Sequence, residues 1–499
     1  MELCASLPAG RQGSTENHRG PQRRVLIITV DMKRLIFLVI LFVPFFNTTA
    51  QLPSEVYKKP LKEVLTDIEK RYNIKLQYSE SLVKGVDVMY PTWRYRIDTE
   101  ETLTNILLPL DLVFQKTGDK VYQISKYAYQ IKPVEEGRKH LEKLLASYPD
   151  LKSWETRKAE LRKCFFEQLG LTPFPKKTPL NPIYTEKRKF DGYTVENVGI
   201  ETIPGYYLCG SLYRPAKGKG PFPAVLCPHG HFNGSDMNSY GRYRPDQQHR
   251  CAMLARMGAV VFSYEMFGYG ESQLMVSKAD HQTGLALTMQ TLNSIRVLDF
   301  LTSLPYVDAK KIGVTACSGG GTQSFLLTAL DDRVTVCVPV VMVSSYFFGG
   351  CPCESGLPIH SCTDLGTNNA EIAAMASPRP MLVVSDGSDW TSNVPTIEFP
   401  YLKKVYELYR KPENVENVHL ANEGHDYGIS KRMAMYDFMA RHLGLNFNAI
   451  KDKEGKVDES KVTIENYEAQ LVFGKDGVRL PATAIKGADK VREVLKSLQ

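Results

Sequence analysis

Apolar residues near the start of the chain first recur at helical spacing and then alternate as in a strand. From Pro60 they fall at Leu61, Val64, Leu65 and Ile68, and residues 74–78 then alternate. A second helical stretch begins at Thr99, and two short strands at 112–115 and 121–124 are joined by a turn at 117–119. The pattern predicts a small α+β domain over residues 51–128.

Charged amphipathic segments come next. Helical spacing at 135–147 and 154–169 is followed by a proline-rich stretch at 172–182, which is typical of helices that end before a new domain. We therefore expect a helical connector over residues 129–182.

From residue 183 the pattern becomes one of apolar strands separated by helices. Residues 193–203 and 206–214 read as a hairpin, and helices are expected at 248–257, 285–304 and 322–330. Fully apolar strands are expected at 224–227, 259–264, 312–315, 334–340 and 381–385. Such strands predict a mostly parallel sheet buried on both faces, hence an α/β domain over residues 183–447. The charged extension 448–499 fits either an α/β tail on this core or a partner-binding segment.

The first fifty residues have the order of charge and hydrophobicity that an export signal needs. Met32, Lys33 and Arg34 precede the apolar run 35–46, and Ala50 offers a small residue for cleavage. We expect a leader over 1–50, with the signal peptide at 32–50 and a periplasmic or secreted product of Gram-negative type. An uncleaved membrane anchor is the alternative, although the run is shorter than the about 20 residues of a membrane span.

Composition narrows the class of protein. The 499 residues are 43% hydrophobic and 23% charged, which is typical of a globular protein. The net charge is +7, and the sequence has no block of like charges that would bind nucleic acid.

Of the ten cysteines, Cys209, Cys227, Cys251 and Cys337 are expected to be packing residues. Cys317, Cys351, Cys353 and Cys362 are candidates for a disulfide whose pairing the spacing leaves open, and a free buried thiol is the default for Cys317.

A strand-to-helix turn carries the candidate nucleophile. Strand 312–315 runs into Ser318, which has small residues two before and two after it, Ala316 and Gly320. Larger side chains would collide in so sharp a turn. The helix start behind the serine presents free N–H groups to a developing oxyanion, and the N–H of Gly319 is one predicted donor. The alternative is a glycine-rich turn without chemistry.

The loop after the first buried strand supplies the second predicted donor. His229, Gly230 and His231 follow Pro228, and the backbone N–H of His231 is assigned to the oxyanion hole. Two histidines in this spacing also suit zinc, but the sequence offers no convincing third ligand. With no dinucleotide, Walker or zinc-protease motif, no metal and no cofactor is expected.

The acid and the base follow in chain order. Asp389 comes shortly after the strand 381–385 and is favoured as the triad acid, with Asp386 as the fallback. His425 lies in a polar, glycine-flanked loop before a helix and is the expected base, whereas His419 lies within a strand. The order Ser318, Asp389, His425 is that of α/β-hydrolases and predicts acyl transfer through a serine nucleophile.

Residues 135–445 resemble the dienelactone-hydrolase-like α/β-hydrolases, often described as acetylxylan esterases. The resemblance rests on four stretches, 227–231, 264–272, 317–323 and 385–390. It implies an α/β-hydrolase fold and a serine carboxylesterase, and it fixes the substrate far less. Residues 51–128 resemble the STN domain at the N-termini of secretins and TonB-dependent receptors, which implies a contact with a periplasmic protein.

An exported esterase of this kind is expected to act on an ester-bearing glycan. A deacetylase of acetylxylan-esterase type is the first prediction. A uronic-acid methylesterase, with Arg242, Arg244 or Arg250 as the cationic group, is the rival. Trp390, Tyr346 and Glu354 are the candidate substrate-binding residues, with core packing as the alternative for the aromatic ones. An inactive hydrolase fold that serves as an interaction or sensory protein is the hypothesis from another class. Nothing in the sequence indicates an oligomeric state.

Overall fold

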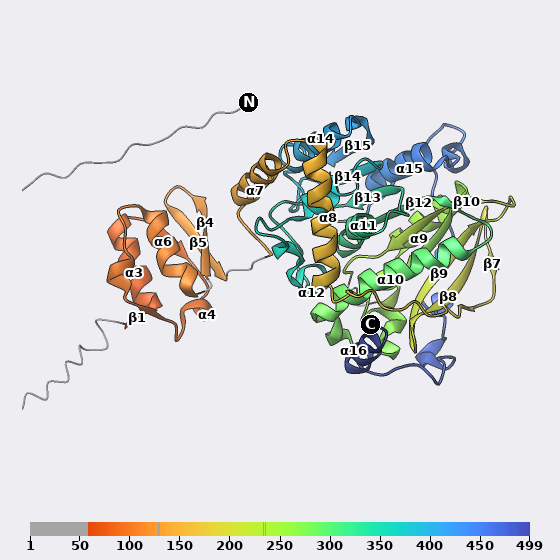
Figure 1. The fold of residues 1–499 in the computed structure, drawn as a ribbon, viewed down its shortest axis with the longest axis horizontal. Helices are drawn as coiled ribbons and strands as arrows, with labels where there is room; N and C mark the ends of the chain where they lie inside the picture. Colours follow the sequence, from red (N-terminus) through yellow and green to blue (C-terminus); the bar gives the residue numbers. More distant parts are fainter. Residues whose placement is uncertain (1–57, 111, 127–129, 233, 235) are drawn as a thin grey trace, which may run out of the picture. The chain divides into compact units, whose positions relative to one another are not determined.

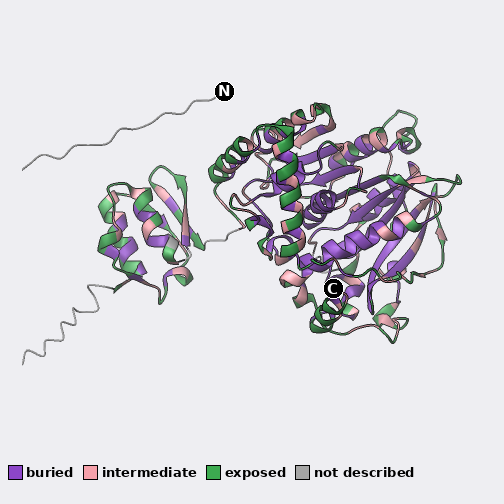
Figure 2. Ribbon diagram, viewed as in Figure 1, coloured by how far each residue is buried: buried purple, intermediate pink, exposed green. Residues whose placement is uncertain are grey.

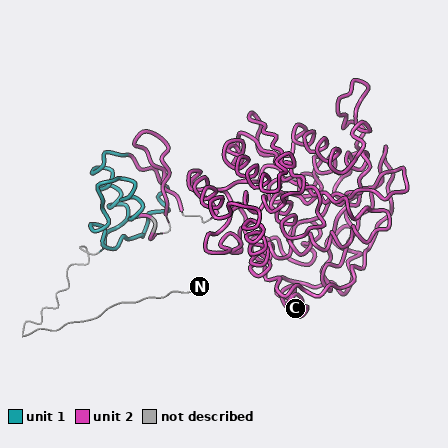
Figure 3. The backbone as a smooth tube through the Cα atoms, turned by 45° about the horizontal axis from the view of Figure 1, so that its top comes forward, with its two compact units in different colours: residues 1–74, 79–106 teal, residues 75–78, 107–499 magenta. Residues whose placement is uncertain are grey.

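The computed structural model describes residues 58–110, 112–126, 130–232, 234 and 236–499. The predicted leader and signal peptide therefore lie outside the described residues. The chain divides into two compact units, one of residues 1–74 and 79–106 and the other of residues 75–78 and 107–499 (Figure 3). Within the described residues, no helix combines the length and the apolar character needed to cross a membrane.

The first unit is built around one amphipathic helix. In α3 (Leu61–Tyr72) the four apolar residues that predicted the helix are all buried, which confirms the helical spacing. Strands β1 (Lys58–Pro60) and β3 (Asp87–Met89) pair antiparallel. The remaining helices are α4 (Glu80–Val83), α5 (Pro91–Arg94) and α6 (Thr99–Leu107).

The second unit contains a small sheet early in its sequence. Strand β5 (Val121–Lys126) pairs antiparallel with β4 (Leu112–Gly118) and parallel with β2 (Lys75–Gln77). All three strands were predicted. The turn between β4 and β5 was predicted too early, at 117–119, because β4 continues to Gly118 and the chain turns at 119–120.

A ten-stranded sheet dominates the second unit (Figure 1). Its order is β15-β14-β13-β12-β10-β11-β9-β8-β6, with β7 also paired to β8, and the run from β15 to β11 is parallel. The strands are β6 (Ile183–Tyr184), β7 (Arg188–Lys189), β8 (Tyr193–Ile203), β9 (Tyr206–Pro215), β10 (Phe222–Pro228), β11 (Val260–Tyr264), β12 (Val307–Cys317), β13 (Val336–Val340), β14 (Met381–Asp386) and β15 (Val415–Leu420). This is the predicted α/β-hydrolase fold, with the predicted hairpin at β8 and β9.

Both faces of the sheet are buried under helices, as the apolar strands predicted (Figure 2). Along β10, Val225 belongs to one hydrophobic core and Leu226 to the other, because successive side chains of a strand point to opposite faces. The core around Leu226 includes residues of α8, α10 and α11, and the core around Val225 includes residues of α9 and α15. The helices are α7 (Val134–Ser147), α8 (Leu151–Gln168), α9 (Pro245–Arg256), α10 (Gly284–Ser303), α11 (Gly319–Leu330), α12 (Pro352–Ser355), α13 (Asn369–Ala374), α14 (Glu398–Leu408), α15 (Ile429–Leu443) and α16 (Ala488–Ser497).

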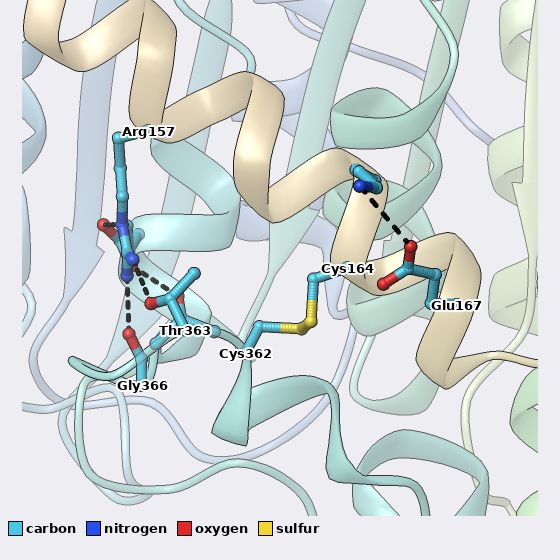
Figure 4. Close-up of a disulfide and its surroundings, with 9 residues drawn as sticks. Arg157, Cys164, Glu167, Cys362, Thr363 and Gly366 are labelled. Carbon is cyan, nitrogen blue, oxygen red and sulfur yellow. Dashed lines mark hydrogen bonds and ion pairs between the residues drawn. A yellow bond between two sulfur atoms is a disulfide. The ribbon is translucent and has the colours of Figure 1, made fainter.

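The predicted connector helices are α7 and α8, and α8 packs into the hydrolase core. Trp154 and Phe165 are fully buried there, and Arg157 forms a buried ion pair with Glu371 at 2.9 Å. Such a pair specifies where the helix lies, because separating it would leave a charge buried without a partner. Arg157 also bonds to Thr363 and to the Gly366 carbonyl (Figure 4).

One disulfide ties α8 to the loop that follows α12. It joins Cys164 to Cys362 (Figure 4). The candidate pairings among Cys317, Cys351, Cys353 and Cys362 do not occur, because the partner of Cys362 is Cys164 on α8. The other three remain free thiols.

The C-terminal extension packs on the hydrolase core. Buried Glu271 accepts hydrogen bonds from the backbone N–H groups of Val472 and Phe473 at 2.7 and 2.6 Å. Apart from α16 and short 3-10 turns, the described extension is irregular, with a single isolated β-bridge between Lys451 and Val457. The α/β-tail alternative was right about its packing on the core but not about strands.

Removing the disulfide should destabilise the hydrolase without changing its fold. The bond spans 198 residues, so its loss in a Cys164→Ala, Cys362→Ala variant should lower the free energy of unfolding by roughly 2–5 kcal/mol. Urea denaturation monitored by circular dichroism measures the change. Dithiothreitol should lower the midpoint of the native protein but not that of the double variant. An equal midpoint for the oxidised native protein and the variant would contradict this role.

Candidate active site

Ser318 lies in a strained turn between β12 and α11. Its φ of 55° and ψ of −131° are a conformation that a residue with a side chain rarely adopts. A Cβ on Gly320 would lie 2.6 Å from the Cβ of Ala316, so the requirement for small residues on both sides of the serine has a direct steric cause. Strain of this kind is what exposes a serine at a nucleophile elbow.

The two predicted oxyanion donors lie beside Ser318. Gly319 is the first residue of α11, so its N–H has no acceptor within the helix. A Cβ on Gly230 would lie 2.7 Å from the Cys317 carbonyl and 3.0 Å from the Ser318 Cβ. The loop that carries His231 therefore approaches the nucleophile as closely as backbone can.

The imidazole of His229 holds that loop in place through two hydrogen bonds to the backbone. Its Nδ1 donates to the Gly230 carbonyl at 2.8 Å, and its Nε2 accepts from the Met266 N–H at 3.1 Å. Complete burial lowers the pKa of this imidazole to about 3, which keeps it neutral and able to make both bonds. Sequence reasoning left His229 without a function, and the structure makes it a positioning residue.

The structure brings the predicted acid and base together. Nδ1 of His425 donates to Oδ2 of Asp389 at 2.6 Å, and the other carboxylate oxygen accepts from the Thr391 N–H and hydroxyl at 2.6 and 2.5 Å. The fallback acid, Asp386, is fully buried and faces Lys431 at 3.4 Å. Burial, with the charge of Asp389 next, raises the pKa of Asp386.

A cavity of about 340 Å³ opens over Ser318. Its lining includes aromatic and polar side chains, and the indole of Trp390 stacks on Phe347 with ring centroids 4.0 Å apart. The ring of His425 lies 4.7 Å from the same indole. The described lining residues are His231, Tyr269, Gln282, Ser318, Phe347, Gly350, Cys351, Glu354 and Trp390.

The predicted substrate-binding residues have different surroundings. Trp390 and Glu354 line the cavity, but the carboxylate of Glu354 accepts the N–H groups of Gly350 and Cys351 at 3.0 and 3.2 Å and so shapes the loop. Tyr346 is not among the described lining residues, and its hydroxyl accepts from the Asn393 amide at 3.4 Å.

No predicted arginine lines the cavity within the described residues. Arg242 is buried against Glu265 at 3.0 Å and Glu271 at 3.5 Å, and Arg250 is buried beneath the ring of Tyr427. Arg244 lies over Phe232. Two of the three charges are therefore internal, which corrects the expectation that they were free to meet a substrate.

The structure also gathers four metal-binding side chains at one wall of the cavity. His231, His281, Cys351 and Cys353 place their ligand atoms within 4.8 Å of one another. The pKa of Cys351 is lowered to about 2, because Cys353 hydrogen-bonds its sulfur and His231 and His281 do the same, although burial opposes the shift. Sequence reasoning considered only His229 and His231 for zinc and treated Cys351 and Cys353 as disulfide candidates. The Cys-x-Cys spacing of 351 and 353 was the signal that could have found the rest.

Comparison with known proteins finds similarity to esterases. No family model matches it. Over 179 residues it is 26% identical to the acetyl esterase Axe7A of Xylanibacter ruminicola, covering 32% of this chain but only 38% of that protein. Over 303 residues it is 23% identical to a 4-O-methyl-glucuronoyl methylesterase of Thermothelomyces thermophilus, covering 52% of this chain and 69% of the relative.

One solved structure resembles the chain along nearly its whole length. Methylesterase BT1017 is 44% identical, with a TM-score of 0.79, and the match covers 90% of this chain and 99% of that one. Identity at this level over whole chains shows common descent as well as a common fold. The chain belongs to the same family as Methylesterase BT1017, a family with the α/β-hydrolase fold.

Proposed function

We propose that this protein is a serine carboxylesterase that removes methyl esters from uronic-acid residues of a glycan. The observation that carries the proposal is the His425–Asp389 hydrogen bond beside a cavity whose floor is Ser318 at a nucleophile elbow. The 44% identity to a methylesterase supports the choice of ester.

The geometry supports an acyl-transfer mechanism. His425, held in one tautomer by Asp389, accepts the proton of Ser318 while the serine oxygen attacks the ester carbonyl. The N–H groups of Gly319 and His231 then stabilise the tetrahedral oxyanion. His425 returns the proton to the leaving alcohol, and a water activated by the same imidazole releases the acid.

The size of the cavity bears on which side of the ester carries the sugar. In a uronate methyl ester the sugar belongs to the acyl group, so the acyl-enzyme would hold a sugar ring on Ser318 while methanol departs. In an acetylated glycan only a two-carbon acyl group stays on the serine. A cavity of about 340 Å³ with an aromatic wall at Trp390 and Phe347 is far larger than an acetyl group needs and suits a sugar face.

A deacetylase is the second candidate, because the elbow and the triad geometry serve either ester equally. The similarity to the acetyl esterase Axe7A favours it, although that match covers only part of each chain. Arg242 and Arg250 are buried, so neither can serve as the cationic group that the sequence predicted for a uronate site. Comparison of methyl-ester and acetyl-ester substrates therefore distinguishes the methylesterase from the deacetylase.

Export and the N-terminal region complete the proposal. The sequence of residues 32–50 supports cleavage by a signal peptidase and a periplasmic or secreted enzyme. We assign residues 51–128 to an STN-like module that contacts a periplasmic protein. Support comes from α3, β2, α6, β4 and β5, which occur in the predicted order, although β1, α4, β3 and α5 were not predicted.

Replacing the nucleophile should abolish activity. Ser318→Ala should lower kcat on p-nitrophenyl acetate by about 10⁴-fold or more, because no other group can form the acyl-enzyme. Ser324→Ala is the matched control: this serine lies in α11, the helix that follows Ser318, is buried, and donates to the Gly320 carbonyl. Retained turnover in folded Ser318→Ala would disprove the serine mechanism.

The two aspartates should separate in their effects. Asp389→Asn should lower kcat by about 10³–10⁴-fold, because the amide no longer holds His425 in the productive tautomer. Asp386→Asn should keep kcat within about tenfold and should lower the free energy of unfolding, because buried Lys431 loses the Asp386 carboxylate at 3.4 Å and keeps only the partly exposed Asp426 at 2.8 Å and Glu423 at 3.5 Å. Steady-state kinetics and thermal melts distinguish the two, and a reversed order would make Asp386 the acid.

Substrate preference should favour the methyl ester. With matched oligouronides, kcat/KM measured by methanol release should exceed that measured by acetate release by at least about tenfold. Trp390→Ala should lower kcat/KM on the methyl-esterified glycan by about 10–100-fold but change turnover of p-nitrophenyl acetate much less. Faster acetate release would establish the deacetylase, and no turnover by folded protein would favour an inactive hydrolase fold that serves as an interaction protein.

A further inference from the structure

We propose that His231, His281, Cys351 and Cys353 form a structural zinc site that fixes the wall of the active-site cavity. The ligands come from three separate segments of the second unit: the loop after β10, the short turn η6 (Lys278–Gln282), and the start of α12, where Cys351 is the N-cap and Cys353 lies in the first turn. Nothing in the proposed esterase chemistry needs two thiols and two imidazoles at this place. The zinc site does not depend on the proposed function. The effect of the site on catalysis, described below, rests on the proposed esterase function.

The spacing of the ligand atoms suits one tetrahedral ion. Nε2 of His231 lies 3.0 Å from Nε2 of His281 and 2.9 Å from Sγ of Cys353, and all four ligand atoms lie within 4.8 Å of one another. Zinc bonds of 2.0–2.1 Å to nitrogen and 2.3 Å to sulfur require ligand atoms about 3.3–3.8 Å apart. Small shifts of these side chains satisfy that geometry.

A hydrogen bond behind one ligand orients it toward the cluster. Nδ1 of His281 donates to the Phe267 carbonyl at 2.6 Å, so its lone pair is on Nε2, the atom that faces His231. Metal-bound histidines are usually held by such a bond through the other ring nitrogen. In addition, the side-chain amide of Gln282 donates to Cys351 Sγ at 3.6 Å.

Burial and ligand type point to zinc rather than a hard cation. His281 and Cys353 are each 1% exposed and Cys351 is 8% exposed, so the ligand atoms are shielded from bulk water. Thiolates buried without a cation would be costly, and a soft ligand set of two sulfurs and two nitrogens selects zinc over magnesium or calcium. Four protein ligands leave no open position, which is typical of a structural ion.

The site would act on catalysis by holding the oxyanion loop. The ring of His231 lies so close to Gly319 that a Cβ there would meet its Cε1 at 2.5 Å. Anchoring that ring to Cys351 and Cys353 would join the loop that supplies one oxyanion N–H to the loop that overhangs Ser318. The ion would therefore maintain the shape of the cavity and would take no part in the bond-breaking step.

A disulfide between Cys351 and Cys353 is the competing arrangement, because an oxidising compartment favours it and only one residue separates the two. The zinc site and the disulfide can be distinguished by measurement. The zinc site keeps both thiols reduced and protects them from alkylation until the metal is chelated, whereas the disulfide excludes the metal.

Metal content of the full-length protein tests the proposal. Protein reconstituted with zinc under reducing conditions and then desalted should contain about one zinc per chain by inductively coupled plasma mass spectrometry. Cys351→Ser with Cys353→Ser should lower this ratio at least tenfold, and His281→Gln should lower it severalfold. Cys337→Ser and His360→Gln are matched controls, since both residues are buried and lie outside the cluster.

Two further measurements keep the test independent of activity and of variant folding. Cobalt bound to the native protein should give the thiolate charge-transfer and intense visible bands of a tetrahedral sulfur-ligated ion. Alkylation of Cys351 and Cys353, read by peptide mass spectrometry, should require chelation. No zinc uptake, zinc retained by the double cysteine variant, or a Cys351–Cys353 disulfide in protein exported to the periplasm and purified without reductant would each overturn the proposal.

Discussion

The backbone at Ser318 is the constraint on which the rest of the site depends. With φ at 55°, the residue persists only because β12 and α11 are held on either side of it by the sheet and by two hydrophobic cores. The same turn aims the serine into the cavity, places the Gly319 N–H at the start of a helix, and demands small residues at 316 and 320.

The fold and the triad could be predicted from sequence because their signals are local. Each signal can be recognised within about ten residues: a fully apolar strand, a turn of small residues, or a polar loop with a histidine. The parallel sheet then brings the carboxyl ends of β12, β14 and β15 to one edge. Choosing Asp389 over Asp386 needed only the direction of a turn, and the hydrogen bond to His425 agrees with it.

Pairings between distant segments carried no such signal. Cys164 and Cys362 are 198 residues apart, and only the docking of α8 on the hydrolase brings them together. Arg242 looked available to a substrate because a basic residue is usually exposed, yet it lies 1% exposed between Glu265 and Glu271. Ligands from three loops were missed for the same reason, since a sequence shows their residue types but not their convergence.

The buried charges explain a stretch that otherwise looks like part of the chemistry. Residues 264–272 carry the resemblance to acetylxylan esterases, but Glu265 pairs with Arg242, and a Cβ on Gly270 would come within 2.2 Å of the Glu265 carboxylate. Glu271 accepts the N–H groups of Val472 and Phe473, and burial, with the charge of Glu265 next, raises its pKa to about 7. This stretch therefore joins the C-terminal extension to the loop behind the oxyanion hole. Because a resemblance can rest on such internal bonds, it identifies the scaffold, and the substrate must be inferred from the residues that face the cavity.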